Sequence, residues 1–446
     1  MKENIYESKS VQTLVLIFSF PAIISLLVEI MASVVDTVFA GHLGADSINA
    51  LTAMGLLSPL LSLYTAIQAL YAVPASVYVA RHLNDKSKCD SYLSTAILVS
   101  LFVSVFISVF SFLRIDNILY LLGAEKQVFL LAKRYLRIQL LSNIFSSLGY
   151  TLTSCIRAFG YPGTELIFTS LSVVVNIIAN AFFVFGFQLE FTGLALGTLV
   201  SEAFCMVLAF IWLAGKQLMP HLYEFRKFKI GMRVWELFRL GFAQMMIQSL
   251  GGCMIFFMNS SLMLYSSLSY VAVWNIVQKI YILLLTPIVG ITQGVQTVIA
   301  YYSGQSQEKR MRKAIYTTVL CTVLWGCTGI LLVFLFGDKF LKFFGISDAI
   351  LSESTDVLKT IFLTFPIMGI FYTILMILEV TGHEIKAVRL TLLRQFFFVL
   401  PLIYLLPSLF SRVKNAVFWA IPVSDLLVLS FIVISRLILS LKRRNR

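Results

Sequence analysis

The stretch PAIISLLVEIMASVVDTVFAGHLG, residues 21–44, decides the fold. It is long and apolar enough for a membrane-spanning helix, which needs about 20 apolar residues. Inside it lies Asp36, roughly four helical turns after Pro21. A carboxylate at that depth costs on the order of 3 kcal/mol, so it is a candidate functional residue.

The composition of the whole chain is that of a membrane protein. Of 446 residues, 59% are hydrophobic and 13% are charged, and the mean hydropathy is +0.89. A soluble domain averages about 25% charged residues. We predict an all-α integral membrane protein with twelve transmembrane helices, because twelve apolar stretches are long enough to span a bilayer. They lie at residues 12–38, 48–78, 92–113, 130–155, 165–187, 191–214, 236–262, 269–302, 314–336, 357–380, 390–409 and 416–440.

Positive charge is distributed unevenly along the chain, whose net charge is +13. Lys and Arg concentrate in the breaks after even-numbered spans, at residues 81–88, 216–233, 309–313 and 386–389, and in the tail LKRRNR. By the positive-inside rule we expect both termini in the cytoplasm, in a multi-pass protein of the plasma membrane, the cell inner membrane. The basic tail is then a topology anchor, and we expect no nucleic-acid partner.

The chain contains an internal duplication. The segment from Tyr135 aligns with the segment from Val357 at a constant shift of 222 residues. The matched identities are Leu136 with Leu358, Leu141 with Leu363, Tyr150 with Tyr372, Thr151 with Thr373 and Gly160 with Gly382. We predict two parallel six-helix repeats, an N-lobe at 1–215 and a C-lobe at 235–446, joined by a basic cytoplasmic linker at 216–234. In parallel repeats the substrate site lies between the repeats near the membrane midplane.

The first half holds few polar residues at membrane depth. Asn176 and Asn180 are one helical turn apart and share a face. Together with Asp36 and Thr198 they offer oxygen ligands for a small hard cation, or a dry pocket for one proton. The alternative interpretation is hydrogen bonding between helices, which Asn and Thr commonly provide in membranes.

Two further features of the first half need an explanation. Glu202 shares a helix face with Thr198 and lies nearer a membrane interface. Gly193 and Gly197 form a G-x-x-x-G pattern, which we interpret as close helix packing.

The second half offers a candidate substrate cavity. Polar residues of its first two spans, and one arginine further on, would line a midplane chamber; they are Gln248, Asn275, Gln278, Lys279 and Arg394. Lys279 needs an acidic partner or water at this depth, and Glu379 and Asp425 are both candidates.

Sequence signatures of enzymes are absent. The chain contains no G-x-x-x-x-G-K-[ST], H-E-x-x-H or G-x-S-x-G. We therefore expect neither an enzyme nor a cofactor. Without a phosphate-binding loop, transport would draw on an ion gradient and not on ATP.

Several segments occur in an order and spacing that resemble the multidrug and toxic compound extrusion (MATE) family over essentially the whole chain. In the first half they are VDTVFAGHLG around Asp36, then YLRIQ, RAFGYPG, NIIANAFFVFG and GLALGT. In the second half they are PIVGITQGVQTVIAYYSGQ, LLRQFFFVLPL and PVSDLL. The resemblance implies two six-helix lobes around a central cavity that alternates between inward-open and outward-open forms.

Within that family the position of Asp36 resembles the DinF-like branch, which is thought to use an N-lobe cation site. Residue by residue, that site would be Asp36, Asn176, Asn180 and Thr198 of this chain. Where the branch often has a second aspartate, this chain has Asn180. A single carboxylate can still take one proton, or one sodium ion together with neutral amides, and both ions remain open.

Three functions compete at this point. The leading one is a cation-coupled antiporter that exports amphipathic, cationic small molecules by alternating access. The second is a flippase for a lipid-linked oligosaccharide or another amphiphilic lipid, and the third is a membrane protein that transports nothing. The duplication and the acid at membrane depth disfavour the third. For partners we expect a small amphipathic substrate and membrane lipid, and we expect the protein to be a monomer.

Overall fold

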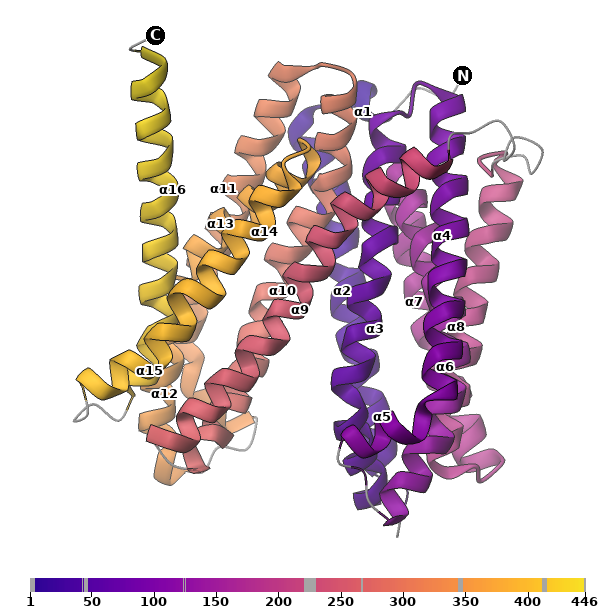
Figure 1. Ribbon diagram of the computed structural model, residues 1–446, viewed down its shortest axis with the longest axis vertical. Helices are drawn as coiled ribbons and strands as arrows, with labels where there is room; N and C mark the ends of the chain where they lie inside the picture. Colours follow the sequence, from indigo (N-terminus) through magenta and orange to yellow (C-terminus); the bar gives the residue numbers. More distant parts are fainter. Residues whose placement is uncertain are drawn as a thin grey trace. The chain divides into compact units, whose positions relative to one another are not determined.

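The computed structural model describes residues 5–41, 43, 47–122, 124, 126–219, 230–265, 268–343, 348–410 and 415–444. Every regular element within these ranges is a helix (Figure 1). Residues 220–229 of the predicted linker at 216–234 lie outside the described residues.

The first half of the chain forms α1 (Ile5–Ser8), α2 (Val11–Gly41), α3 (Ser47–Arg81), α4 (Lys86–Leu113), α5 (Ile115–Leu121), α6 (Lys126–Ala158), α7 (Pro162–Ala181), the π-helix η2 (Phe182–Gly186) and α8 (Glu190–Gly215). The second half forms α9 (Ile230–Tyr265), α10 (Leu268–Gly304), α11 (Glu308–Phe343), α12 (Asp348–Phe362), α13 (Phe365–Val380), α14 (Glu384–Leu392), the π-helix η4 (Leu393–Val399), α15 (Leu400–Leu409), the 3₁₀ turn η5 (Ala416–Trp419) and α16 (Ala420–Arg444).

Each of the twelve predicted spans falls on one of these helices or on consecutive pieces of one. In the described residues, ten stretches are both long and apolar enough to cross a membrane. The stretches on α6 and α9 are not among them. On α6 the reason is a polar inward face, whose buried members include Gln139, Ser142, Asn143 and Ser147.

The chain divides into two compact units. Unit 1 comprises Met1–Met246 and Gly294–Met311, and unit 2 comprises Ile247–Gln293 and Arg312–Arg446. Unit 1 therefore contains the first half of the sequence together with the start of α9, the end of α10 and the start of α11. The lobe boundaries at 215 and 235 remain a sequence-based prediction.

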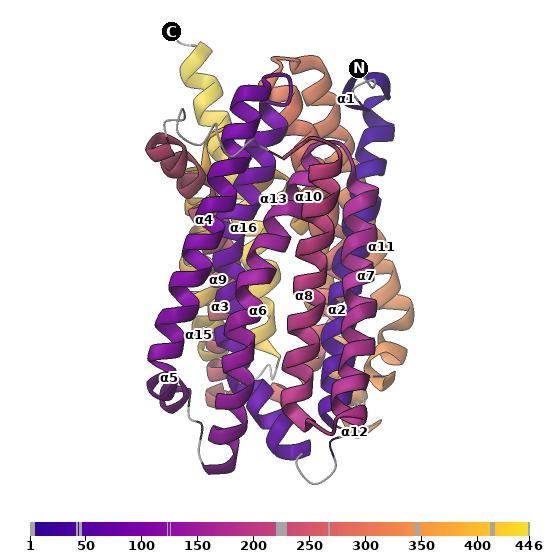
Figure 2. The ribbon, with the colours of Figure 1, turned by 90° about the vertical axis from the view of Figure 1, so that its right-hand side faces the viewer.

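Unit 1 is a bundle of antiparallel helices. α6 packs against α8, α3 and α4, while α7 packs against α8 and α2 (Figure 2). The apolar cluster nearest the candidate site includes Tyr135, Leu136 and Leu140 of α6 and Phe191 and Leu194 of α8. Burial of such side chains from both helices fixes how α6 and α8 face each other.

The two faces of α4 differ in polarity. Ser100, Ser104, Ser108 and Ser111 are buried, at the three- and four-residue spacing of one helix face. Phe102, Phe106 and Phe110 are exposed, as a lipid-facing surface requires. Small hydroxyl side chains at a helix interface let two backbones approach closely in a membrane.

Two spans of unit 2 are irregular. The tenth predicted span breaks between α12 and α13, at Leu363 and Thr364, just before Pro366. Proline at this position has no N–H to contribute and accommodates a new helix start. The eleventh span is interrupted by η4, and π-helical segments occur frequently at functional sites.

The duplication has a direct structural counterpart. Gly160 and Gly382, aligned by the 222-residue shift, both adopt positive φ, at 92° and 80°. Each follows the end of a long helix by two residues, α6 in one half and α13 in the other. A side chain rarely adopts this conformation, so glycine ends the helix in both copies.

Candidate functional site

Asp36 of α2 faces an asparagine of α7 in unit 1. The Nδ2 of Asn180 donates a hydrogen bond of 2.6 Å to Asp36 Oδ1, and a second of 3.1 Å to Asn176 Oδ1. Asn180 is wholly buried and Asn176 is 6% exposed. The structure thus brings together three of the four residues that the sequence predicted for a cation site.

The backbone of α8 makes this arrangement possible. A Cβ added to Gly197 would overlap Asn180 Oδ1, and one added to Gly193 would lie 3.0 Å from the carbonyl carbon of Phe183. Only glycine leaves room for α7 and η2 at these two positions. The prediction that the G-x-x-x-G pattern gives close helix packing is confirmed.

One oxygen at the site lacks a partner. Asn180 Oδ1 is buried and accepts no hydrogen bond within the described residues. An unsatisfied buried acceptor is costly, so it is a candidate ligand atom. Thr198, the fourth predicted residue, does not bond to Asp36, because its hydroxyl donates to the backbone oxygen of Leu194 at 3.1 Å.

No ion pair involves Asp36 among the residues that the structure describes. The neighbours that the sequence prediction missed are uncharged. Tyr135 of α6 lies within electrostatic range of Asp36 and stacks on Phe191, with ring centroids 4.4 Å apart. Gln139 donates a hydrogen bond of 3.0 Å to the Tyr135 hydroxyl. Both residues belong to the YLRIQ segment, and its resemblance to the family could have identified them as candidates.

A second acidic pair lies in unit 1. Glu29 and Glu202 interact electrostatically, and Ser146 hydrogen-bonds to Glu202. Glu29 precedes Asp36 by seven residues on α2, which is two helical turns along the same face. Glu202 was a candidate from the sequence, whereas Glu29, in the first predicted span, was not.

Unit 2 holds a contrasting aspartate. The Nε of Arg394 donates to Asp425 Oδ1 at 2.8 Å, and the hydroxyl of Thr364 donates to Asp425 Oδ2 at 2.8 Å. The guanidinium of Arg394 also lies over the Phe371 ring, 5.4 Å from its centroid. Arg394 is 6% exposed and Asp425 is 2% exposed. The irregular elements η4 and the α12–α13 break thus meet α16 at one buried ion pair.

The other predicted cavity residues differ in exposure. Gln248 and Lys279 are exposed and Gln278 is partly buried, while the side chain of Asn275 lies outside the described residues. Asp425, one of the two acids considered for Lys279, pairs with Arg394 instead. That the five residues line one chamber remains a prediction.

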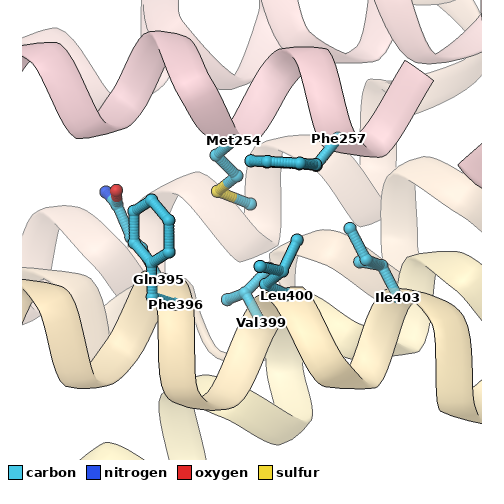
Figure 3. A pocket seen from close by; sticks show the side chains of 7 residues that line it. All are labelled: Met254, Phe257, Gln395, Phe396, Val399, Leu400 and Ile403. Atoms are coloured by element: carbon cyan, nitrogen blue, oxygen red, sulfur yellow. The ribbon is translucent and has the colours of Figure 1, made fainter. Parts of the chain in front are cut away.

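A small pocket opens between α9 and the η4–α15 segment of unit 2 (Figure 3). Its walls are a thioether, two phenyl rings, three aliphatic side chains and one amide, from Met254, Phe257, Gln395, Phe396, Val399, Leu400 and Ile403. Apart from the Gln395 amide, this lining is apolar, as in most small-molecule pockets.

Metal-ligand clusters are not found in the described ranges, where no three His, Cys, Asp or Glu side chains converge.

A family model described as MatE matches the chain twice, over residues 21–182 and 242–405. The two matches start 221 residues apart (242 − 21), close to the shift of the duplication. The multidrug export protein MepA of Staphylococcus saprophyticus is 26% identical over 427 residues, which cover 94% of this chain and 92% of the relative. The protein of the same name from Staphylococcus aureus is 25% identical over 430 residues, with the same coverage.

Solved structures share the fold. A crystal structure of MATE in complex with MaL6 superposes with a TM-score of 0.90 at 19% identity, covering 99% of this chain and 100% of that chain. A transporter of the MOP superfamily from Pyrococcus furiosus gives a TM-score of 0.86 at 19% identity, covering 96% and 95%. The fold is therefore the two-lobe helical membrane fold with an internal repeat.

Proposed function

Since this chain belongs to the MATE family, we propose that it is a cation-coupled antiporter that exports amphipathic, cationic small molecules by alternating access. The relatives above are named multidrug export proteins, which supports export of this substrate class. The protein is then a transporter and not an enzyme, and its coupling ion is a proton or sodium.

The observation that carries the coupling proposal is the environment of Asp36. Its carboxylate receives a hydrogen bond from an amide and has no cationic partner among the described residues. A charge in low-dielectric surroundings needs a compensating charge. An exchangeable cation provides it, and this is what a coupling ion does.

The donor set fits either ion. A proton would reside on Asp36 itself. A sodium ion would use Asp36 Oδ1, Asn176 Oδ1 and, after a half-turn of the amide, the unpartnered Oδ1 of Asn180. Thr198 would join only if its hydroxyl left the Leu194 carbonyl. This N-lobe arrangement also supports the DinF-like branch.

Coupling requires that the ion prefer one conformation. An ion shifts a two-state equilibrium only by its difference in affinity for the two states. The close contact of Asn180 with Gly197 links the site to the packing of α7 on α8. A change in this packing would move the amide oxygens and so change the affinity for the ion.

The unit 2 pocket supports an amphipathic substrate. Met254, Phe257 and Phe396 offer polarisable and aromatic surfaces, which adapt to varied ligands and attract organic cations. The flippase alternative loses support, because Asp425 neutralises Arg394, one of the cations proposed to bind a lipid headgroup. We propose that Gln248, Asn275, Gln278 and Lys279 line the rest of the path.

Topology follows from the same proposal. We place both termini in the cytoplasm and the protein in the plasma membrane, because Lys and Arg concentrate in the breaks on that side. The protein would work as a monomer surrounded by lipid, with no cofactor.

Transport in proteoliposomes tests this function. Ethidium, an aromatic organic cation, should move against an imposed proton gradient or sodium gradient, and ATP should have no effect. Asp36→Asn should reduce gradient-driven transport at least about 100-fold, while the matched substitution Asp356→Asn at an exposed acid of α12 should not. Transport that requires ATP, or an Asp36→Asn variant that still responds to both gradients, would refute the coupling proposal.

A further inference from the structure

The short N-terminal helix α1 is anchored more firmly than its length predicts. Helices below about 12 residues are marginal on their own, and α1 has four. Yet Tyr6 is wholly buried, next to the exposed Glu7 and Ser8. Tertiary contacts therefore hold α1 in place, and all those described below lie within unit 1.

One set of contacts comes from the first half of the sequence. The Tyr6 hydroxyl donates a hydrogen bond of 2.7 Å to the backbone oxygen of Ala158, one of the free carbonyls at the end of α6. A Cβ added to Gly160 would lie 2.7 Å from Ile5 Cγ2. The Tyr6 ring also packs on Phe18, with centroids 5.3 Å apart.

A second set comes from the second half of the sequence. The Tyr6 ring stacks on Tyr301 at the end of α10, with centroids 4.5 Å apart and an interplanar angle of 14°. The Tyr302 hydroxyl donates a hydrogen bond of 3.0 Å to the backbone oxygen of Tyr6. The Tyr301 hydroxyl donates one of 2.8 Å to Glu7 Oε1. Both halves therefore hold α1 at once.

The same end of unit 1 contains further contacts between the two sequence halves. Asn84 Nδ2 donates to Gln305 Oε1 at 2.8 Å, and the Tyr92 hydroxyl donates to Glu236 Oε2 at 2.6 Å. At Gly304 an added Cβ would overlap the backbone oxygen of Arg81. The parts of α9 and α10 that belong to unit 1 thus lie directly against the first half on the membrane side where α2 begins.

We propose that α1 is a latch that holds this side of the transporter shut. The inference rests on alternating access as proposed above, in which the sequence halves separate on one side and then on the other. Separation here must break one of the two contact sets of α1. On the second-half side, Thr297 also bonds to the Tyr6 hydroxyl and Arg310 donates to the Tyr6 backbone oxygen at 3.4 Å. The set from the second half should break, because α1 leads directly into α2 of the first half and packs Ile5 into the space beside Gly160.

A distance measurement between spin labels tests the latch without measuring transport. The labels are attached at Ser87→Cys and Lys309→Cys in an otherwise cysteine-free protein, because both positions are exposed and one lies in each sequence half. Tyr302→Phe removes only the hydroxyl that reaches Tyr6. The ratio of open to closed distances should rise roughly fivefold, the change that loss of one buried hydrogen bond produces.

Tyr71→Phe is the matched control. Its hydroxyl donates to Ser147 Oγ at 2.6 Å, and both residues belong to the first half, so the ratio should stay unchanged. If Tyr302→Phe does not fold, Tyr301→Phe provides the same test through Glu7. A ratio equal to that of Tyr71→Phe would overturn the latch, whether or not the protein proves to be cation-coupled. Gly304→Ala should open this side even with α1 intact.

Discussion

Two aspartates at membrane depth, one in each unit, differ in what neutralises them. Asp425 is paired with Arg394 at 2.8 Å and accepts a second hydrogen bond from Thr364. Asp36 has an amide partner, Asn180, and no ion pair within the described residues. The unit 2 carboxylate carries its own counter-charge, and the unit 1 carboxylate does not.

This difference indicates which acid can couple to an ion. A buried pair that is already neutral gains nothing from a mobile cation, and breaking it leaves a lone charge. A carboxylate that faces only uncharged polar groups still lacks a positive charge to compensate it, and a mobile cation can supply that charge. The same residue type is therefore structural in one unit and a candidate coupling group in the other.

Asp425→Asn should have the largest effect on stability, and it is the strongest test of the comparison. It leaves the Arg394 guanidinium buried without its partner, which should lower the free energy of unfolding by about 3–5 kcal/mol. Denaturant titration in detergent micelles measures this. The double variant Asp425→Asn with Arg394→Met removes both charges and should recover most of the loss. If the double variant is no more stable than the single one, the pair is not the cause.

Thr364→Val comes next. It keeps the shape of the side chain at the helix break and removes one hydrogen bond to the Asp425 carboxylate. Hydrogen bonds to charged groups contribute about 1.5–3 kcal/mol, so the same titration should show a loss in this range. The control is Thr318→Val, a fully buried threonine whose hydroxyl bonds only within α11. Equal losses at both positions would mean that Asp425 does not depend on Thr364.

Gly197→Ala tests whether Asn180, the partner of Asp36 in unit 1, takes part in ion binding. The new methyl group would meet the Asn180 amide, and overpacking of this kind costs about 1–3 kcal/mol. Because the amide must move, the ion dependence of ethidium transport should also change. Gly215→Ala is the control on the same helix, where no atom lies within 4 Å of an added Cβ. Altered stability with unaltered ion dependence would show that Asn180 is no ligand.

Asp36→Asn should have the smallest effect on stability, below about 1 kcal/mol. The new amide oxygen can accept the same hydrogen bond from Asn180, and no buried cation is left unpaired. A near-zero change for Asp36→Asn and a large loss for Asp425→Asn would show that only Asp425 has a fixed cationic partner. A loss as large as that of Asp425→Asn would mean that Asp36 has a fixed cationic partner after all.

The sequence predicted the architecture because hydrophobic length and repetition are local signals. The twelve spans followed from runs of about 20 apolar residues, and the aligned Gly160 and Gly382 followed from the 222-residue shift. The pairing of Asp36 with Asn180 and Asn176 followed from family resemblance, and the i, i+4 spacing fixed only that the two amides share a face.

The partner of Arg394 could not be predicted in the same way. It depends on how the break at Thr364 and the π-helix η4 rotate their helices, and neither irregularity has a periodic signature in the sequence. The contacts of the α1 latch could not be predicted from the sequence either. α1 is too short for a hydrophobic pattern, and its partners lie up to 304 residues away, at Arg310.

The serine face of α4 bears on how this helix can move. The hydroxyls of Ser100 and Ser104 donate to backbone oxygens of their own helix, at 2.9 Å and 3.1 Å, so these bonds travel with α4. The hydroxyl of Ser108 instead donates to the backbone oxygen of Leu140 on α6, at 2.7 Å. The Tyr64 hydroxyl of α3 donates to Ser111 Oγ of α4 at 2.8 Å. Along the serine face, a displaced α4 therefore keeps its hydroxyl bonds at Ser100 and Ser104 and must break those at Ser108 and Ser111. At its start α4 is also bonded to α9, through Tyr92 and Glu236. Shear against α6 is therefore easiest in the middle of α4, around Ser100 and Ser104.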